Sequence, residues 1–161
     1  MKETFYALPD PFWACSGKLR VSDPKFDIGD SRGFTVDNVK MGLWYASVSR
    51  TGAEPDHGCV TKLCITHHMA NWPMQEQQRF IIETDGIAAL IDEGAYNHEA
   101  WEGERYDCCW RASMRLFEAD TVLCGASCRS GCGPGKYEGA AMRDVSGQIV
   151  RVSISFCEKR Q

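Results

Sequence analysis

Cysteine is the residue type whose number and spacing first suggest chemistry in this 161-residue chain. The chain has nine cysteines, and Cys124, Cys128 and Cys132 follow one another with three residues between neighbours. Structural zinc sites usually take two ligand pairs of the CxxC kind, a spacing that is absent from the sequence. An odd number of cysteines also leaves at least one thiol over in a fully oxidised monomer. We therefore expect free thiols that pack as small apolar groups, with no metal and no cofactor.

Cys108 and Cys109 could supply a nucleophile if a histidine lay beside them. A cysteine nucleophile needs a base that raises its thiolate fraction, and the two groups must meet in space. The histidines of the chain are His57, His67, His68 and His98. None of them shares a local motif with a cysteine, and 22 acidic residues make chance acid–base pairs plentiful. A thiol-dependent enzyme is therefore the least favoured hypothesis, and we expect a protein without catalytic residues.

A glycine-rich segment from Gly131 to Gly135 could bind an anion, because glycine lets the backbone approach a phosphate closely. The segment is not the Walker sequence GxxxxGK[ST], and a strand is predicted after it, so no helix dipole would assist. A loop or bulge at the entry of a hairpin is the structural alternative. The candidate residues of a small-ligand site, for a nucleotide-like molecule, are Asp23, Asp85, Gly131, Gly133, Gly135 and Tyr137.

Tryptophans are the candidate anchors for a protein partner, since tryptophan is enriched among the residues that dominate binding energy at interfaces. Trp44 is the exception, because it lies in an alternating strand pattern and is expected in the core. The candidate partner-binding residues are Trp13, Trp72 and Trp110.

Composition indicates one folded domain over residues 1–161. Apolar residues make up 43% of the chain and charged residues 25%, as in globular rather than disordered proteins. The net charge of −4 disfavours general binding to a phosphate backbone and would suit a basic groove on a protein partner. Apolar stretches are too short for a signal peptide or for the ~20 residues that span a bilayer. We therefore expect a cytoplasmic protein that does not enter membranes.

Strand patterns dominate the chain, and one helical pattern interrupts them. The range 42–49 alternates between two sets of side chains, as a strand with one buried face does. Apolar residues recur at helical spacing over 98–117, so a helix is expected there, with Trp101, Leu116 and Phe117 in the core. These patterns predict an α+β fold that is mainly antiparallel β, as a sandwich or open barrel, with one main helix packed on the sheet.

The end of the chain contains the clearest structural pattern, a β-hairpin. Ranges 136–143 and 148–156 flank the turn residues 144–147, and the second arm alternates between apolar and polar side chains. Residues 38–42 are expected to form a further hairpin connection between the strands on either side of them.

Several blocks resemble, in the same order, an uncharacterised domain family of small bacterial and phage proteins. The block 16–24, SGKLRVSDP, is similar to the family's SGKLxVxDPC-like block. Block 83–92 resembles a VDSGQAGxxD-like block, and block 105–109 resembles a WYDxCC-like block. Ranges 129–137 and 146–156 resemble an SSGYGDGxY-like block and the DGxIVxIxIxF-like strand that follows it.

Two departures fall in the glycine-rich block, where Cys132 and Pro134 replace the family's tyrosine and aspartate. The resemblance implies a shared β-rich fold and carries no activity, because the family has no assigned function. Its phage members suggest the sharpest form of the favoured hypothesis, a small non-catalytic binding domain that is a phage-borne inhibitor of a bacterial defence system. A nucleotide-like ligand binder and a thiol-dependent enzyme are the alternatives.

Overall fold

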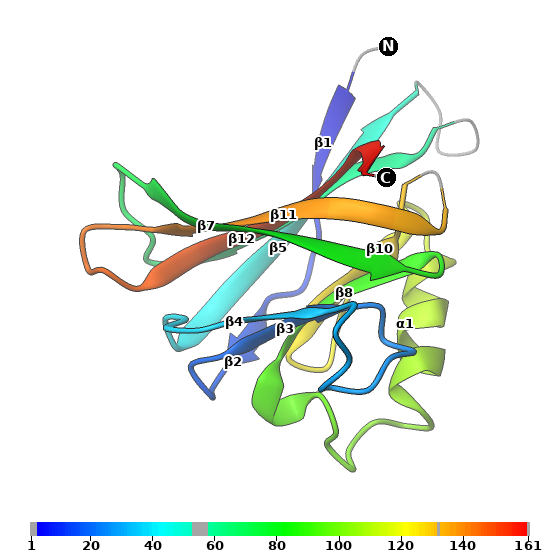
Figure 1. Ribbon diagram of the computed structural model, residues 1–161, viewed down its shortest axis with the longest axis horizontal. Helices are drawn as coiled ribbons and strands as arrows, with labels where there is room; N and C mark the ends of the chain where they lie inside the picture. The colour runs from blue at the N-terminus through cyan, green and yellow to red at the C-terminus, as the bar shows by residue number, and fades with distance from the viewer. Residues whose placement is uncertain (1–2, 53–57, 132, 161) are drawn as a thin grey trace.

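Two antiparallel sheets make up most of this protein (Figure 1). The computed structural model describes residues 3–52, 58–131 and 133–160, with the backbone alone described from 157 onward. The large sheet runs β1-β5-β6-β12-β11-β7, with β2 beside β5. Its strands are β1 (Glu3–Ala7), β2 (Phe12–Ala14), β5 (Gly42–Thr51), β6 (Val60–His67), β7 (Gln75–Thr84), β11 (Gly135–Arg143) and β12 (Ile149–Arg160). The small sheet runs β4-β3-β8-β10-β9, with β3 (Leu19–Ser22), β4 (Phe34–Val36), β8 (Ile87–Asp92), β9 (Ala119–Val122) and β10 (Gly125–Arg129). The prediction of a mainly antiparallel β fold is confirmed.

The two sheets face each other across a shared hydrophobic core. Trp44, Ile65 and Ile154 enter this core from the large sheet, and Leu90 and Ala126 enter it from the small sheet. All five are fully buried, as the alternation of apolar side chains along the strands requires. The described strands therefore form a sandwich-like pair of sheets with separate edges, and they do not close into a barrel.

Close packing where the sheets meet depends on one glycine. Phe34 of the small sheet stacks on Phe80 of the large sheet with ring centroids 4.6 Å apart. Gly139 of β11 lies directly beneath the second ring, so that a Cβ at this position would lie 2.2 Å from Phe80. A larger residue at position 139 would therefore push the stacked rings out of place.

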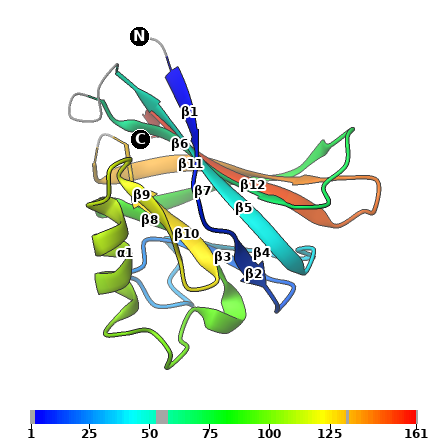
Figure 2. The ribbon, with the colours of Figure 1, turned by 180° about the vertical axis from the view of Figure 1, so that it is seen from behind.

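A second, smaller core lies on the other face of the small sheet, away from the large sheet. Helix α1 (Arg105–Ser113) covers this face, as the two opposite views show (Figures 1 and 2). Cys109 of α1 packs there with Ile91 of β8 and with Tyr96, which follows the 3-10 turn η1 (Glu93–Ala95). In the described part of the chain, no helix has the length and apolar character needed to cross a membrane.

The helix is shorter than the predicted range 98–117. Gly103, two residues before α1, has a φ of +87°, a left-handed conformation that does not continue a right-handed helix. Trp101 is buried as expected, but it lies outside the helix and its indole N–H donates to the carbonyl of Ala95 at 2.9 Å. The helical spacing of apolar residues in the sequence therefore extends beyond the helix itself, to residues that precede the turn at Gly103.

Leu116 corrects a further expectation, because 68% of this side chain is exposed and it does not belong to the core. It lies in the short connection between the end of α1 and the start of β9. Phe117, by contrast, is partly buried and stacks on Tyr6 with ring centroids 4.3 Å apart.

The hairpin at the end of the chain is confirmed as β11 and β12, but residues 38–42 do not form a hairpin connection. The strands on either side, β4 and β5, belong to different sheets. The segment instead pairs with the start of β12, since Ile149 N–H donates to Asn38 and Lys40 N–H donates to Ile149. Residues 38–42 thus carry the chain from one sheet to the other.

Candidate functional site

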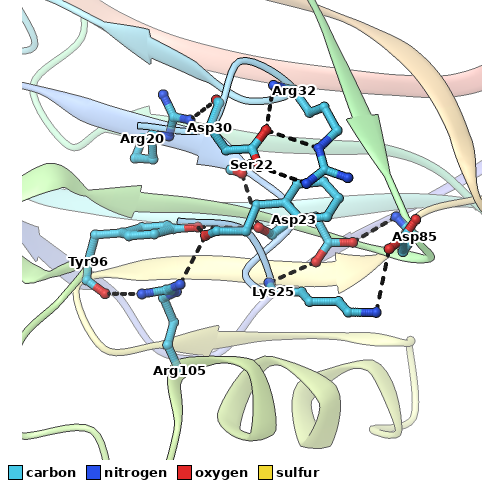
Figure 3. A network of polar contacts seen from close by, with 10 residues as sticks. Arg20, Ser22, Asp23, Lys25, Asp30, Arg32, Asp85, Tyr96 and Arg105 are labelled. Carbon is cyan, nitrogen blue, oxygen red and sulfur yellow. Dashed lines mark hydrogen bonds and ion pairs between the residues drawn. The ribbon is translucent and has the colours of Figure 1, made fainter. Parts of the chain in front are cut away.

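Asp23 and Asp85, two candidates for a small-ligand site, lie against each other (Figure 3). Asp23 directly follows β3, and Asp85 lies in the turn between β7 and β8. The Asp23 carboxylate accepts the backbone N–H of Asp85 at 2.7 Å and that of Lys25 at 2.9 Å. Only 1% of Asp23 is exposed. Its carboxylate is therefore a buried link between the loop that follows β3 and the turn between β7 and β8.

Burial and hydrogen bonding have opposite effects on the charge of the Asp23 carboxylate. Burial raises the pKa of the Asp23 carboxyl, while the two backbone N–H donors act in the opposite direction. The ammonium of Lys25 lies 3.5 Å from the carboxylate of Asp85, but both side chains are more than half exposed. That ion pair is a surface feature, whereas the Asp23 hydrogen bonds are internal.

Two arginines and a tyrosine hold the loop that follows Asp23 (Figure 3). Arg105 donates to the carbonyls of Pro24 at 2.9 Å and Phe26 at 3.0 Å, and its guanidinium lies 3.8 Å above the ring of Tyr96. The Tyr96 hydroxyl donates to the carbonyl of Phe26 at 2.8 Å. Further along the loop, the buried Arg20 donates to the carbonyl of Asp30. The loop is therefore fixed by internal hydrogen bonds.

Sequence reasoning missed Tyr96 and Arg105. Tyr96 meets the carbonyl of Asp23 across 73 residues of sequence, and Arg105 meets that of Pro24 across 81. Tyr96 carries no local signal, and Arg105 lies within the range 98–117, for which the sequence predicts a helix. Such contacts follow from the tertiary arrangement alone.

The glycine-rich segment lies at the same corner of the molecule. Ser130 N–H donates to the carbonyl of Gly86 at 2.8 Å, next to Asp85, and Gly135 pairs with Thr84 in the large sheet. The hydroxyl of Tyr137, fully buried, donates to the carbonyls of Gly133 at 2.5 Å and Ser130 at 3.2 Å. The structure thus brings the six candidate ligand-binding residues to one corner.

The hydrogen bonds of this segment do not favour a phosphate cradle. The N–H of Gly131 donates to the carbonyl of Arg129, and the N–H of Gly133 donates to that of Ser130. Gly131 has a φ of +46°, and a Cβ there would lie 2.5 Å from Phe156. Gly131 therefore allows the chain to pass close to β12, and the N–H groups of Gly131 and Gly133 are used inside the loop.

A pocket of 560 Å³ opens beside the Asp23 loop, and its volume falls within the roughly 300 to 1,000 Å³ of small-molecule sites. Its lining carries both signs of charge. The lining residues that carry a charge or an imidazole are Lys25, Asp27, His98, Glu99, Glu104 and Arg105. None of the described residues of the Gly131 to Gly135 segment lines it. Four hydrogen bonds to Pro24, Phe26, Tyr96 and Asn97 already occupy the Arg105 guanidinium. The pocket therefore has no single charge preference that would define a ligand class.

The cysteines whose side chains the structure describes are free thiols, and burial disfavours the reactive thiolate in two of them. Burial raises the pKa of Cys109 to about 12 and also raises that of Cys128, so both stay protonated at neutral pH. Cys108 is partly exposed, and its sulfur receives an N–H of Arg111 at 3.3 Å. Cys132, the last residue of the predicted cluster, lies outside the described residues. Among the side chains that are described, no group of three or more His, Cys, Asp or Glu is placed to hold a metal ion.

Two of the three candidate tryptophans lie at one face of the large sheet. Trp13 of β2 pairs directly with Leu43 of β5, and residues directly opposite each other in a sheet point to the same side. The guanidinium of Arg151 lies 5.9 Å from the ring of Trp72 and donates to the hydroxyl of Thr66 on the same side. Trp110 lies on α1, beyond the small sheet. The third candidate is therefore on a different surface.

We call this side of the large sheet, which points away from the small sheet, the outer face. On its three central strands it comprises Leu43, Tyr45, Ser47, Ser49, Lys62, Cys64, Thr66, Arg151, Ser153 and Ser155. Exposure follows the pleat of β5, with Tyr45 48% exposed and its neighbours Trp44 and Ala46 buried. Trp13 is 60% and Trp72 71% exposed at the end of this face where β5 begins. No element of the described chain packs against Tyr45 and the two tryptophans closely enough to bury them.

Comparison with known proteins gives no match: no family model, no curated protein and no solved structure matches this chain. The resemblance to an uncharacterised bacterial and phage family therefore stays a prediction, and no function comes from a relative.

Proposed function

We propose that this chain is a small non-catalytic binding domain for a protein partner, and that the partner contacts the outer face. The observation that carries the proposal is the placement of Trp13 and Trp72 at the same end of that face, both more than half exposed. Large apolar side chains left exposed together are a feature of interaction sites.

The neighbours of these tryptophans have the composition of an interface centre. Tyr45 lies on the same face, and Met41 and Met69 are 59% and 60% exposed at the same end of β5 and β6. Tryptophan, tyrosine, methionine and arginine are enriched where protein partners meet, and the first two often dominate the binding energy. The outer face therefore supports protein binding better than the corner at Asp23 supports a nucleotide-like ligand. In its sharpest form, the proposed partner is a component of a bacterial defence system.

A capture experiment with matched variants tests this proposal. The immobilised protein is exposed to a bacterial lysate, together with the double variant Trp13→Ser/Trp72→Ser and the single variant Trp110→Ser. We expect the wild type and Trp110→Ser to retain the same protein in stoichiometric amount, and the double variant to lose it. Mass spectrometry identifies the retained chain, which tests the defence-system form.

Two results would contradict the proposal. One is a bait that retains no stoichiometric protein. The other is a partner that the double variant still retains while Trp110→Ser loses it, which would move the binding surface to α1. Circular dichroism of all three variants controls for folding, and the exposed positions of the three tryptophans predict that each variant folds.

A further inference from the structure

The outer face is positively charged at its centre, although the whole chain carries a net charge of −4. The side chains that β5, β6 and β12 direct to this face include two cations, Lys62 and Arg151. The same set, among the described residues, includes no aspartate or glutamate. These three strands thus differ in sign from the protein as a whole, and on the next strand, β11, the row of Lys62 continues to Glu138, whose charge is paired with that of Arg79.

Neither cation has a carboxylate partner among the described side chains. Lys62 is exposed and lies between Ser49 and Ser155 on the neighbouring strands. Arg151 contacts the Thr66 hydroxyl at 3.3 Å and the ring of Trp72. Ion pairs with carboxylates are formed, in the described part of the chain, by Lys18, Lys25, Arg32, Arg50, Arg79, Arg115 and Arg129. Lys62 and Arg151 are therefore free to meet the charge of a partner.

A band of small side chains runs between the two cations. Ser47, Cys64, Ser153 and Ala140 stand opposite one another on four neighbouring strands. Lys62 lies in the row on one side of this band, and Arg151, with Tyr45, lies in the row on the other. These two rows are four residues apart along each strand, or roughly 13 Å at the usual rise of a strand. That distance accommodates an α-helix, whose diameter with side chains is about 10 to 12 Å.

We propose that the partner presents an acidic amphipathic helix that lies across the strands of the outer face, over this band. Its apolar side packs on the small side chains and against Trp13, Tyr45 and Trp72. Its carboxylates meet Lys62 along one edge and Arg151 along the other. This inference rests on the proposed function and adds the charge and shape of the bound segment.

A protein helix fits these features better than a nucleic acid does. A polynucleotide carries a charge at every nucleotide, and the net negative charge outside the two-cation centre would repel most of them. A helix with a few carboxylates on its flanks needs only the two cations that the face supplies. Nucleic acid therefore enters as a competing outcome of the test.

The test uses a synthetic amphipathic helical peptide with leucine on one side and glutamate along both flanks. The comparison peptide has lysine in place of every glutamate, and poly(U) is the nucleic-acid probe. Binding is followed at low salt by the fluorescence of the intact protein, because Trp13 and Trp72 would be covered. Two double variants with equal changes in net charge are compared, Lys62→Glu/Arg151→Glu on the outer face and Lys18→Glu/Arg111→Glu elsewhere.

The glutamate peptide is expected to give saturable binding that the outer-face variant weakens about tenfold or more, with the other double variant within about twofold of wild type. The outer-face variant should gain affinity for the lysine peptide. Equal binding of both peptides by the wild type would overturn the inference. So would a failure of the outer-face charge reversals to weaken binding, or tighter binding of poly(U) that depends on the same two cations.

The two proposals fail in different ways. If the lysate partner is lost in Trp13→Ser/Trp72→Ser while the glutamate peptide does not bind, the inference falls and the proposed function stands. If lysate capture is indifferent to both tryptophans, the proposed function falls, and the inference falls with it.

Discussion

The carboxylate of Asp23 accepts the backbone N–H of Asp85 at 2.7 Å, across 62 residues of sequence. Asp23 follows β3 of the small sheet, and Asp85 follows β7 of the large sheet. A second bond at the same junction runs from the N–H of Glu83 to the carbonyl of Arg32 at 2.9 Å. The buried carboxylate therefore connects the two sheets at their common corner, which gives Asp23 a structural role independent of any ligand.

Replacing Asp23 by asparagine is expected to lower the free energy of unfolding by about 1 to 3 kcal/mol. An amide has one oxygen, so only one of the two backbone N–H groups, of Lys25 or Asp85, would keep its acceptor. Urea denaturation measures the change. Asp85→Asn is the control, since it removes only the exposed ion pair with Lys25 and should cost less than about 1 kcal/mol. Equal effects of the two substitutions would contradict this role of Asp23.

Tyr137→Phe is expected to cost about 1 to 2 kcal/mol and to loosen the loop before β11. The change removes a buried hydroxyl that donates to the carbonyls of Ser130 and Gly133. Hydrogen exchange of the amides at Ser130 and Gly133 reports the loosening, and denaturation reports the energy. Tyr45→Phe, at a position that is 48% exposed, is the matched control and should leave both unchanged. Unaltered exchange in Tyr137→Phe would show that the hydroxyl does not hold this loop.

His67 makes the stability of the fold sensitive to acid. Its Nδ1 accepts the N–H of Met69 at 3.0 Å and its Nε2 donates to the carbonyl of Met41 at 2.9 Å, so the neutral ring is the bonded form. Burial lowers the pKa of His67 below its usual 6.5. The unfolded chain therefore binds a proton more readily, and stability is retained above pH 6.5 and lost as pH falls below it.

The variant His67→Gln should lose this sensitivity, because glutamine keeps a donor for Met41 and does not titrate. Thermal unfolding between neutral pH and about pH 5 should show a steeper fall in Tm for the wild type than for the variant. Parallel curves would contradict the assignment to His67.

Thiol labelling is expected to separate the cysteines by burial. In the native protein, iodoacetamide should modify the exposed Cys15 well before Cys109 and Cys128, whose thiols burial keeps protonated. In denaturant the differences should disappear, which is the control. Mass spectrometry of the peptides follows each site. Native modification of Cys109 as fast as Cys15 would contradict its burial and restore the thiol-enzyme hypothesis.

Features set by local sequence could be predicted, and features set by tertiary contacts could not. The hairpin of β11 and β12 has both its strands and its turn in one continuous segment. Strand β10 was missed because its first four residues, 125–128, are all small and are buried on both faces, so the strand shows no apolar alternation. Helix α1 was placed correctly but extended too far in both directions, because apolar spacing continues where the backbone turns at Gly103.

For the candidate site residues, too, residue type could be read from the sequence, whereas their contacts could not. Choosing Asp23, Asp85 and the glycines found residues that meet in space, but the sequence pattern did not reveal that their polar groups are used within the protein. Trp13 and Trp72 could be proposed as anchors from residue type alone. That they share one face follows from the pairing of β2 with β5 and from the position of Arg151, which no local pattern encodes.

Site-specific photo-crosslinking at Tyr45 tests most directly whether the outer face is the binding surface. Tyr45 is replaced by p-benzoylphenylalanine in one protein and Trp110 in another, two positions that are each 48% exposed but lie on different surfaces. Irradiation in bacterial cells should crosslink the Tyr45-substituted protein to one partner chain and leave the Trp110-substituted protein uncrosslinked. Crosslinks from position 110 without crosslinks from position 45 would contradict binding at the outer face.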